Sequence, residues 1–184
     1  MSAMAERPRR AKAGGLLVRT ALLVGVVFVL DQASKYWAVS LLFGRDFANA
    51  DLFEALPPRA IEVTGFLNWV LVGNTGVSFG LFAGAGLWLF IVIALIIAAF
   101  LVGWLLRSGM RWLIWPVGLI IGGAVGNVVD RLRFGAVVDF IDVHAAGYHW
   151  PAFNVADSAV FIGVALVLLE AFLGSKKEAG AEGG

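Results

Sequence analysis

Four long apolar runs, separated by more polar segments, dominate the pattern of this chain. A helix needs about 20 apolar residues to cross a hydrocarbon core of roughly 30 Å, and each run approaches that length. The runs occupy residues 20–39, 86–106, 112–129 and 154–173. The sequence therefore predicts four transmembrane helices.

The two longer segments between these runs have a pattern typical of strands. Residues 61–82, IEVTGFLNWVLVGNTGVSFGLF, mix β-branched and aromatic residues with Gly and Asn, which favours short strands and turns. Residues 137–143, VVDFIDV, also suit an extended strand, in which Asp139 and Asp142 would lie on opposite faces. We expect an all-α membrane protein of four transmembrane helices with a small extracytoplasmic β-cradle.

Composition and charge support this topology and orient it. About 60% of the 184 residues are hydrophobic and only 15% are charged, which is outside the range of soluble domains. Basic residues flank the predicted helices on one side: Arg7, Arg9, Arg10, Lys12, Arg19, Arg107, Arg111, Lys176 and Lys177. Short loops rich in Lys and Arg stay in the cytoplasm. Both termini are then cytoplasmic, and the loops at about 40–85 and 130–153 face outward.

The chain divides into one membrane domain and two tails. We expect cytoplasmic tails at residues 1–15 and 174–184 around a four-helix membrane domain of residues 16–173 with its outer loops. The first apolar run is too long for a cleavable signal peptide and lacks a convincing small-residue cleavage site, so it is interpreted as a helix. There are no cysteines, which excludes a disulfide, a thiol nucleophile and a Cys-based metal site. Nucleic acid is not expected as a partner.

Ionisable residues inside a membrane helix are costly unless they are paired or face water. Asp31 and Lys35 are four residues apart and share a helical face. They can form an internal ion pair, or Lys35 can anchor an anionic group at the outer surface with Asp31 positioning it. These two interpretations are compatible.

A second polar group lies near the end of the third apolar run. Asn127, Asp130 and Arg131 are three and four residues apart, so they share a face. The pattern favours a hydrogen-bonded network at the membrane boundary, in which Asp130 and Arg131 neutralise each other. Two successive small-xxx-small patterns precede this group and permit close helix contact. They are formed by Gly118, Gly122 and Gly126.

The start of the fourth run carries a possible helix cap and two candidate acid–base groups. Asn154 can cap the helix, with Asp157 in its first turn, and capping alone explains both residues. It does not explain Asp139, which can reach Asp157 if the chain folds back. Two neighbouring carboxylates share a proton, so that one can act as a base and the other as an acid in amide hydrolysis.

Other chemistries have weaker support. Ser34 and Lys35 are adjacent and do not face each other, and His144 and His149 are predicted to lie in a loop without a set of metal ligands. We expect neither a metal nor an organic cofactor.

Four motifs identify a family. They are DQASKYW at 31–37, NTGVSFG at 74–80, GNVVDRLRFGAVVDFIDV at 126–143 and FNVADSAVFIG at 153–163. The motifs occur in this order between four apolar runs. On this basis the chain resembles lipoprotein signal peptidase, also called signal peptidase II or prolipoprotein signal peptidase. The resemblance extends from Leu16 to Phe172 and is specific because the motifs occur together.

The resemblance implies a role for each polar position. Asp139 and Asp157 match the catalytic aspartates of an aspartic endopeptidase. The remaining matched positions are a supporting shell that shapes the substrate site or holds the fold: Asp31, Lys35, Asn74, Asn127, Asp130, Arg131 and Asn154.

The resemblance also implies partners and location. The substrate is a prolipoprotein whose cysteine carries diacylglycerol, and cleavage occurs just before that cysteine. Membrane lipids and a globomycin-type cyclic peptide inhibitor are further implied partners, and the implied location is the bacterial cytoplasmic (inner) membrane. The loop around NTGVSFG would cover the peptide, its glycines allowing close backbone approach.

Two features depart from the family pattern. The first outer loop, which includes residues 44–60, is longer than in many members, and Gly73 stands where a larger side chain is usual. Two other functions are left open by the residues alone: a small proton or ion transporter that uses its intramembrane carboxylates, and a structural membrane subunit. Four helices without a detectable inverted repeat make a poor transporter unless the protein oligomerises.

Overall fold

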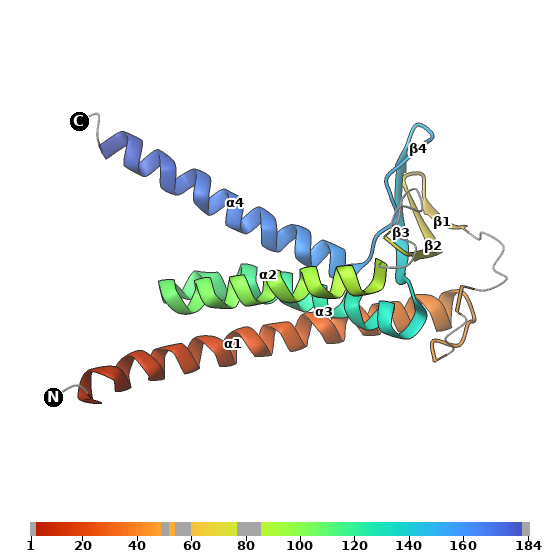
Figure 1. Ribbon diagram of the computed structural model, residues 1–184. Coiled ribbons are helices and arrows are strands. Elements are labelled where there is room, and N and C mark those ends of the chain that lie inside the picture. Colours follow the sequence, from red (N-terminus) through yellow and green to blue (C-terminus); the bar gives the residue numbers. More distant parts are fainter. Residues whose placement is uncertain (1–2, 49–51, 54–59, 77–85, 182–184) are drawn as a thin grey trace.

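In the computed structural model, four helices extend from a small sheet toward the end where both termini lie, and the last helix diverges from the other three toward that end (Figure 1). The structure describes residues 3–48, 52–53, 60–76 and 86–181. Among these residues, four helices are long and apolar enough to cross a membrane, judged by length and composition. The helices are α1 (Ala3–Tyr36), α2 (Gly86–Ser108), α3 (Ile114–Phe134) and α4 (Val155–Ala181). The four predicted helices are therefore confirmed.

The helix ends differ from the prediction in α1, α3 and α4. A π-helix, Trp37–Leu42, continues α1, and a 3-10 helix, Arg111–Leu113, precedes α3. Helix α3 extends past Val129 to Phe134 and ends at Gly135, whose φ of 70° is left-handed. Gly135 N donates to Arg131 O at 3.0 Å, which is a common glycine helix end. Helices α1 and α4 also continue into the segments expected as tails.

Helix α3 is the centre of the bundle and contacts the other three helices. An added Cβ at Gly118 would lie 2.6 Å from Leu23 Cδ2 of α1, and one at Gly122 would lie 2.7 Å from Val27 Cβ. On another face of α3, a Cβ at Gly123 would overlap the carbonyl oxygen of Ala156 in α4. Close contact through small residues is thus what brings α1 and α4 against α3.

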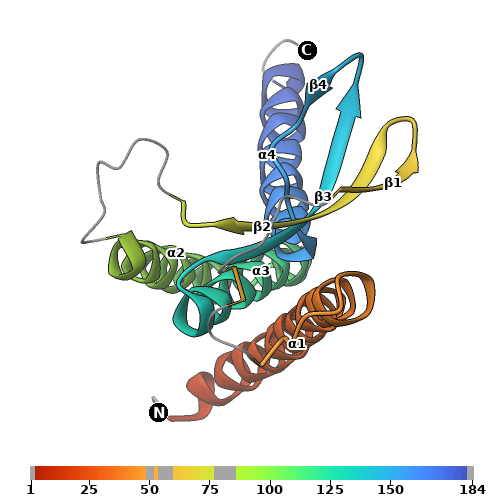
Figure 2. The same cartoon turned by 90° about the vertical axis from the view of Figure 1, so that its right-hand side faces the viewer.

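Four antiparallel strands form the sheet, in the order β1-β2-β3-β4 (Figure 2). They are β1 (Ala60–Thr64), β2 (Leu67–Asn74), β3 (Val137–Ala145) and β4 (Tyr148–His149). Strand β3 follows α3 almost directly. The predicted strands are confirmed. Of the NTGVSFG loop, residues 77–80 lie outside the described residues, as does most of the 44–60 loop.

Gly73 has a specific packing partner. Its added Cβ would lie 2.8 Å from Cγ of Phe53. Phe53 in turn packs beside a buried cluster of Val39, Phe47, Leu52 and Val138 under the sheet. The small residue at position 73 therefore makes room for an aromatic ring that belongs to this cluster.

Candidate active site

Asn154 stands at the junction between the sheet and α4, and its amide links two aspartates. Its Nδ2 donates to Asp139 Oδ1 at 2.7 Å, and its Oδ1 accepts from Asp157 N at 2.9 Å. Asp157 Oδ2 accepts in return from Asn154 N at 3.3 Å. This reciprocal pair caps the amino terminus of α4, as predicted, and satisfies two of its free N–H groups.

Asp139 is buried on β3 and is held by a second amide. Asn74 Nδ2 donates to its Oδ2 at 2.9 Å. Burial is the main cause that raises the pKa of Asp139 from 3.8 to about 7. The hydrogen bond from Asn74 opposes the rise, the charge of Asp157 adds to it, and Asn154 and Lys35 lower it. Asp139 thus combines a proton available near neutral pH with fixed geometry.

Asn127 joins this pair to the helix bundle. Its Nδ2 donates to Asp157 Oδ1 at 2.8 Å, and its Oδ1 accepts from Asn154 Nδ2 at 3.3 Å. Lys35 Nζ also donates to Asn127 Oδ1 at 3.3 Å. With donors from Asn127 and from Asn154 N, and with the start of α4 beside it, Asp157 has surroundings that suit a carboxylate.

Lys35 is the centre of a buried ionic group between α1 and α3. Its Nζ lies 2.8 Å from Asp31 Oδ2 and 2.7 Å from Asp130 Oδ2, and all three side chains are fully buried. Gln32 Nε2 donates to Asp130 Oδ1 at 2.9 Å, and Val138 N donates to Asp130 Oδ2 at 3.1 Å. The internal ion pair is confirmed, and Lys35 has no exposed surface with which to anchor an external anion.

Asp31 also reaches the start of α4. Its Oδ1 accepts from Ala156 N at 3.0 Å, so that α1 supplies a second cap to that helix. A Cβ at Gly126 would overlap Asp31 Oδ2, which shows why this approach needs glycine on α3. The ionic group is thus a support for the two candidate carboxylates.

The predicted neutralisation of Asp130 by Arg131 is wrong. Asp130 pairs with Lys35, and no ion pair among the described residues uses Arg131. Adjacent residues on a helix point in different directions, so Arg131 instead places its Cζ 4.4 Å from the Phe90 ring centroid. Its Nη1 donates to Asn127 O at 3.4 Å.

Asp142 belongs to a separate group on the sheet. Asn68 Nδ2 donates to its Oδ2 at 2.9 Å, and His149 Nδ1 lies 2.9 Å from both of its carboxylate oxygens. Burial acts to raise its pKa, but the hydrogen bonds from His149 and Asn68 and the nearby histidines outweigh it, so the pKa is lowered. As predicted, Asp142 and Asp139 have different surroundings.

The two histidines are not in a loop, contrary to the prediction. His144 is in β3 and His149 is in β4, paired across the strands with stacked rings 4.9 Å apart. The short turn that allows this contains Ala146 and Gly147, both with positive φ. Among the described residues, no group of three or more His, Asp or Glu side chains could hold a metal ion.

All nine residues singled out from the sequence lie in one connected network of hydrogen bonds and ion pairs. The sequence interpretation missed Gln32, which bonds to both Asp31 and Asp130. Its signal was a polar side chain in an apolar run, next to an aspartate already noted.

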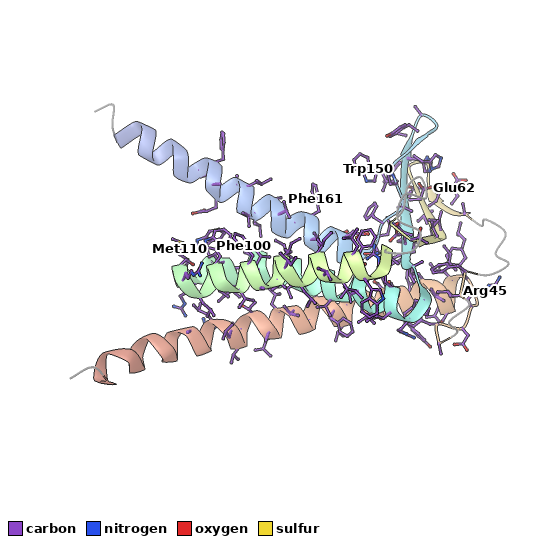
Figure 3. The ribbon with its side chains drawn as sticks, viewed as in Figure 1. Arg45, Glu62, Phe100, Met110, Trp150 and Phe161 are labelled. Carbon is purple, nitrogen blue, oxygen red and sulfur yellow. The ribbon has the colours of Figure 1, made fainter. Side chains whose placement is uncertain are left out.

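An apolar cavity of about 490 Å³ opens beside Asp157. It is lined by Trp150, Phe153, Asp157, Ser158, Phe161 and Ile162. Figure 3 shows Trp150 by β4 and Phe161 on α4, near the sheet end of the molecule. The half-buried Asp157 therefore borders a space that suits an apolar chain.

Comparisons with known proteins agree on one family. The family model for signal peptidase II matches residues 23–173. Lipoprotein signal peptidases from Thermodesulfovibrio yellowstonii and Aeromonas hydrophila are 41% and 43% identical, over 82% and 85% of this chain and 92% and 89% of their own. Two bacterial membrane enzymes solved by the in meso method are similar in structure. That at 2.3 Å resolution has a TM-score of 0.67 and 28% identity over 86% of this chain and 90% of its own; that at 1.9 Å has a TM-score of 0.66 and 31% identity over 83% and 91%. The chain belongs to the signal peptidase II family of lipoprotein signal peptidases.

Proposed function

We propose that the chain is an aspartic endopeptidase that cleaves diacylglyceryl-modified prolipoproteins just before the lipidated cysteine, with Asp139 and Asp157 as its catalytic pair. Membership of the signal peptidase II family makes it a membrane protease that removes signal peptides from prolipoproteins. The observation that carries the aspartic assignment is the pair of amides that joins the two carboxylates: Asn154 Nδ2 donates to Asp139 Oδ1 and to Asn127 Oδ1, and Asn127 Nδ2 donates to Asp157 Oδ1.

The two aspartates would divide the acid and base roles. Asp157, with its amide donors, acts as the ionised base that takes a proton from the attacking water. Asp139, whose pKa is raised to about 7 by burial, acts as the acid that donates a proton to the carbonyl oxygen. Collapse of the resulting gem-diol breaks the C–N bond as Asp157 gives the proton it took from water to the leaving nitrogen, while Asp139 regains a proton from a hydroxyl of the gem-diol. The products are the signal peptide carboxylate and a free amino group on the lipidated cysteine.

The cavity beside Asp157 supports a lipidated peptide substrate. Its lining is almost wholly apolar, apart from Asp157 and Ser158, and it lies where α4 meets the sheet. An amphipathic substrate would hold its scissile bond at the level of the carboxylates and its apolar parts against the cavity. A globomycin-type cyclic peptide would compete for the same space.

The topology follows from the same arrangement. Both termini and the basic residues Arg107 and Arg111 lie at the end opposite the sheet (Figure 1). The positive-inside rule puts that end in the cytoplasm, so the catalytic pair lies near the outer face of the inner membrane.

Cleavage of a diacylglyceryl-modified prolipoprotein by purified enzyme tests the proposal, with the product followed by gel shift and mass. Wild type should cleave before the lipidated cysteine, whereas Asp139→Asn and Asp157→Asn should fold but not cleave, because Asn cannot exchange the proton. Asp142→Asn is the matched control, since this buried aspartate lies on the same strand with other partners. Equal cleavage by all four proteins would exclude the aspartic mechanism.

The transport alternative is not favoured by the family comparisons. The same preparations distinguish it: proton or ion flux in vesicles without any peptide cleavage would restore it. Variants that lose assembly with a partner, in preparations that show neither flux nor cleavage, would favour a structural subunit.

A further inference from the structure

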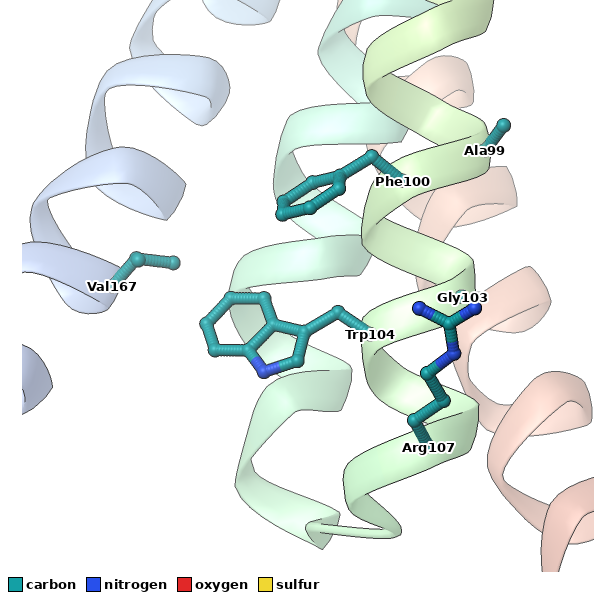
Figure 4. A pocket seen from close by; sticks show the side chains of 6 residues that line it. All are labelled: Ala99, Phe100, Gly103, Trp104, Arg107 and Val167. Atoms are coloured by element: carbon teal, nitrogen blue, oxygen red, sulfur yellow. The ribbon is translucent and has the colours of Figure 1, made fainter.

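A second cavity, of about 550 Å³, lies between α2 and α4 away from the candidate active site. Its lining is formed by Ala99, Phe100, Gly103, Trp104, Arg107 and Val167 (Figure 4). It occupies the half of the bundle opposite the sheet, where Figure 3 shows Phe100 and Met110. The residues of the catalytic proposal do not line it.

Aromatic side chains of α2 form one wall of this cavity, which is called the channel below. In Figure 4 the rings of Phe100 and Trp104 extend from α2 toward Val167 of α4. Trp104 is held at this angle by an edge-to-face contact with Trp112, with the ring centroids 6.3 Å apart. An added Cβ at Gly103 would meet no heavy atom within 4 Å, so the channel is open at this residue. Apolar walls of this kind suit an acyl chain.

One cation, Arg107, lines this cavity, and in Figure 4 its guanidinium is directed along α2 toward Gly103. It is exposed, and within the part of the chain that the structure describes it forms no hydrogen bond or ion pair. Glu170, one turn beyond Val167 on α4, is not paired with it either. An apolar channel beside an arginine without a counterion is complementary to an anionic phospholipid, which has apolar acyl chains and a negatively charged phosphate.

We propose that this cavity binds one anionic phospholipid, with its phosphate against Arg107 and an acyl chain between Phe100, Trp104 and Val167. The charge of Arg107 argues against the signal peptide as the occupant, because the end of a signal peptide on that side of the membrane is itself basic. Since α4 carries Asp157 in its first turn, the bound lipid also holds the far half of this helix at a set distance from α2. The inference does not depend on the peptidase activity.

Thermal unfolding in mixed micelles tests the site without any cleavage assay. Dioleoyl phosphatidylglycerol at about ten times its dissociation constant should raise the Tm of wild type by about 3–6 °C, and dioleoyl phosphatidylcholine should not. Gly103→Leu fills the channel and Arg107→Gln removes its charge, so each should abolish the difference between the two lipids. Leucine favours a helix more than glycine does, so Gly103→Leu should fold. Native mass spectrometry of the same samples should show one phosphatidylglycerol retained by wild type alone.

Two variants separate a built site from a general charge effect. Arg111→Gln removes another exposed cation at the same end and should keep the phosphatidylglycerol response. Glu170→Gln should also keep it, whereas its loss would mean that Arg107 acts through Glu170. An equal response to both lipids, or equal loss in Arg111→Gln, would overturn the proposal. A dimer mass that is lost in Gly103→Leu would also overturn it, because a helix of a second copy would then fill the channel. A raised KM for prolipoprotein with the lipid response intact would overturn it too, because the signal peptide would then fill the channel.

Discussion

Lys35 Nζ of α1 lies 2.7 Å from Asp130 Oδ2 of α3, with both side chains fully buried. The same nitrogen is 2.8 Å from Asp31 Oδ2 and donates to Asn127, which contacts Asp157. One cation therefore connects two carboxylates of the scaffold with the polar residues around the candidate catalytic pair. Replacing Lys35 should therefore mainly lower the stability of the fold.

Lys35→Met should destabilise the protein by about 3–5 kcal/mol, because Asp31 and Asp130 would remain buried without a counterion. Thermal unfolding in detergent measures this loss. Adding Asp31→Asn and Asp130→Asn to Lys35→Met should recover much of it, since the uncompensated charges are then gone. A Lys35→Met variant as stable as wild type would contradict the buried ion pair.

Local spacing was enough to predict some of this site. Asp31 and Lys35 are one helical turn apart, and the cap formed by Asn154 and Asp157 spans four residues, so both contacts follow from helix geometry. The alternation in VVDFIDV likewise separates Asp139 from Asp142.

Contacts between distant segments could not be predicted in the same way. The pattern of apolar residues does not say which helices are neighbours, so Asp130 was assigned to the adjacent Arg131 and not to Lys35 on another helix. The polar residues after Val129 resembled a loop because their burial depends on partners elsewhere in the fold. His149 joins a strand for a similar reason, since β4 exists only through its pairing with β3.

Asn154→Ser should separate helix capping from the positioning of Asp139. Serine is a good cap for α4, but it lacks the Nδ2 that donates to Asp139 Oδ1 at 2.7 Å. We expect a nearly unchanged Tm with cleavage slowed about 100-fold, the cost of a misplaced catalytic group. Asn154→Ala should lose both properties. Wild-type cleavage by Asn154→Ser would show that the amide contact to Asp139 is dispensable.

Gly123→Ala should move α4 away from α3, because the new methyl group would overlap the carbonyl oxygen of Ala156, a backbone atom that cannot rotate aside. The expected cost is about 1–3 kcal/mol, with a loss of cleavage because Asp157 is the next residue along α4. Gly25→Ala on α1 is the matched control, since its Cβ would meet nothing within 4 Å. Similar unfolding and cleavage for the two variants would argue against the close packing at Gly123.

Asp139 should give the stability of the protein a pH trend opposite to that from a carboxylate whose pKa is lowered on folding. Its folded pKa, raised to about 7 by burial, lies above the unfolded value of 3.8, so the folded state binds the extra proton between these values. That stabilising contribution is complete below pH 4 and is lost as the pH rises through about 7, by up to about 1.4 kcal/mol per pH unit. Asp139→Asn should therefore be more stable than wild type at pH 8, with a smaller difference in stability at pH 5. Cleavage by wild type should fall above pH 7 as Asp139 loses its proton.

Asp142→Asn should show the opposite pH trend in stability, because the lowered pKa of Asp142 makes its stabilising contribution disappear as the pH falls. Parallel unfolding curves for wild type and Asp139→Asn from pH 5 to 8 would mean that Asp139 is ionised throughout and cannot be the proton donor.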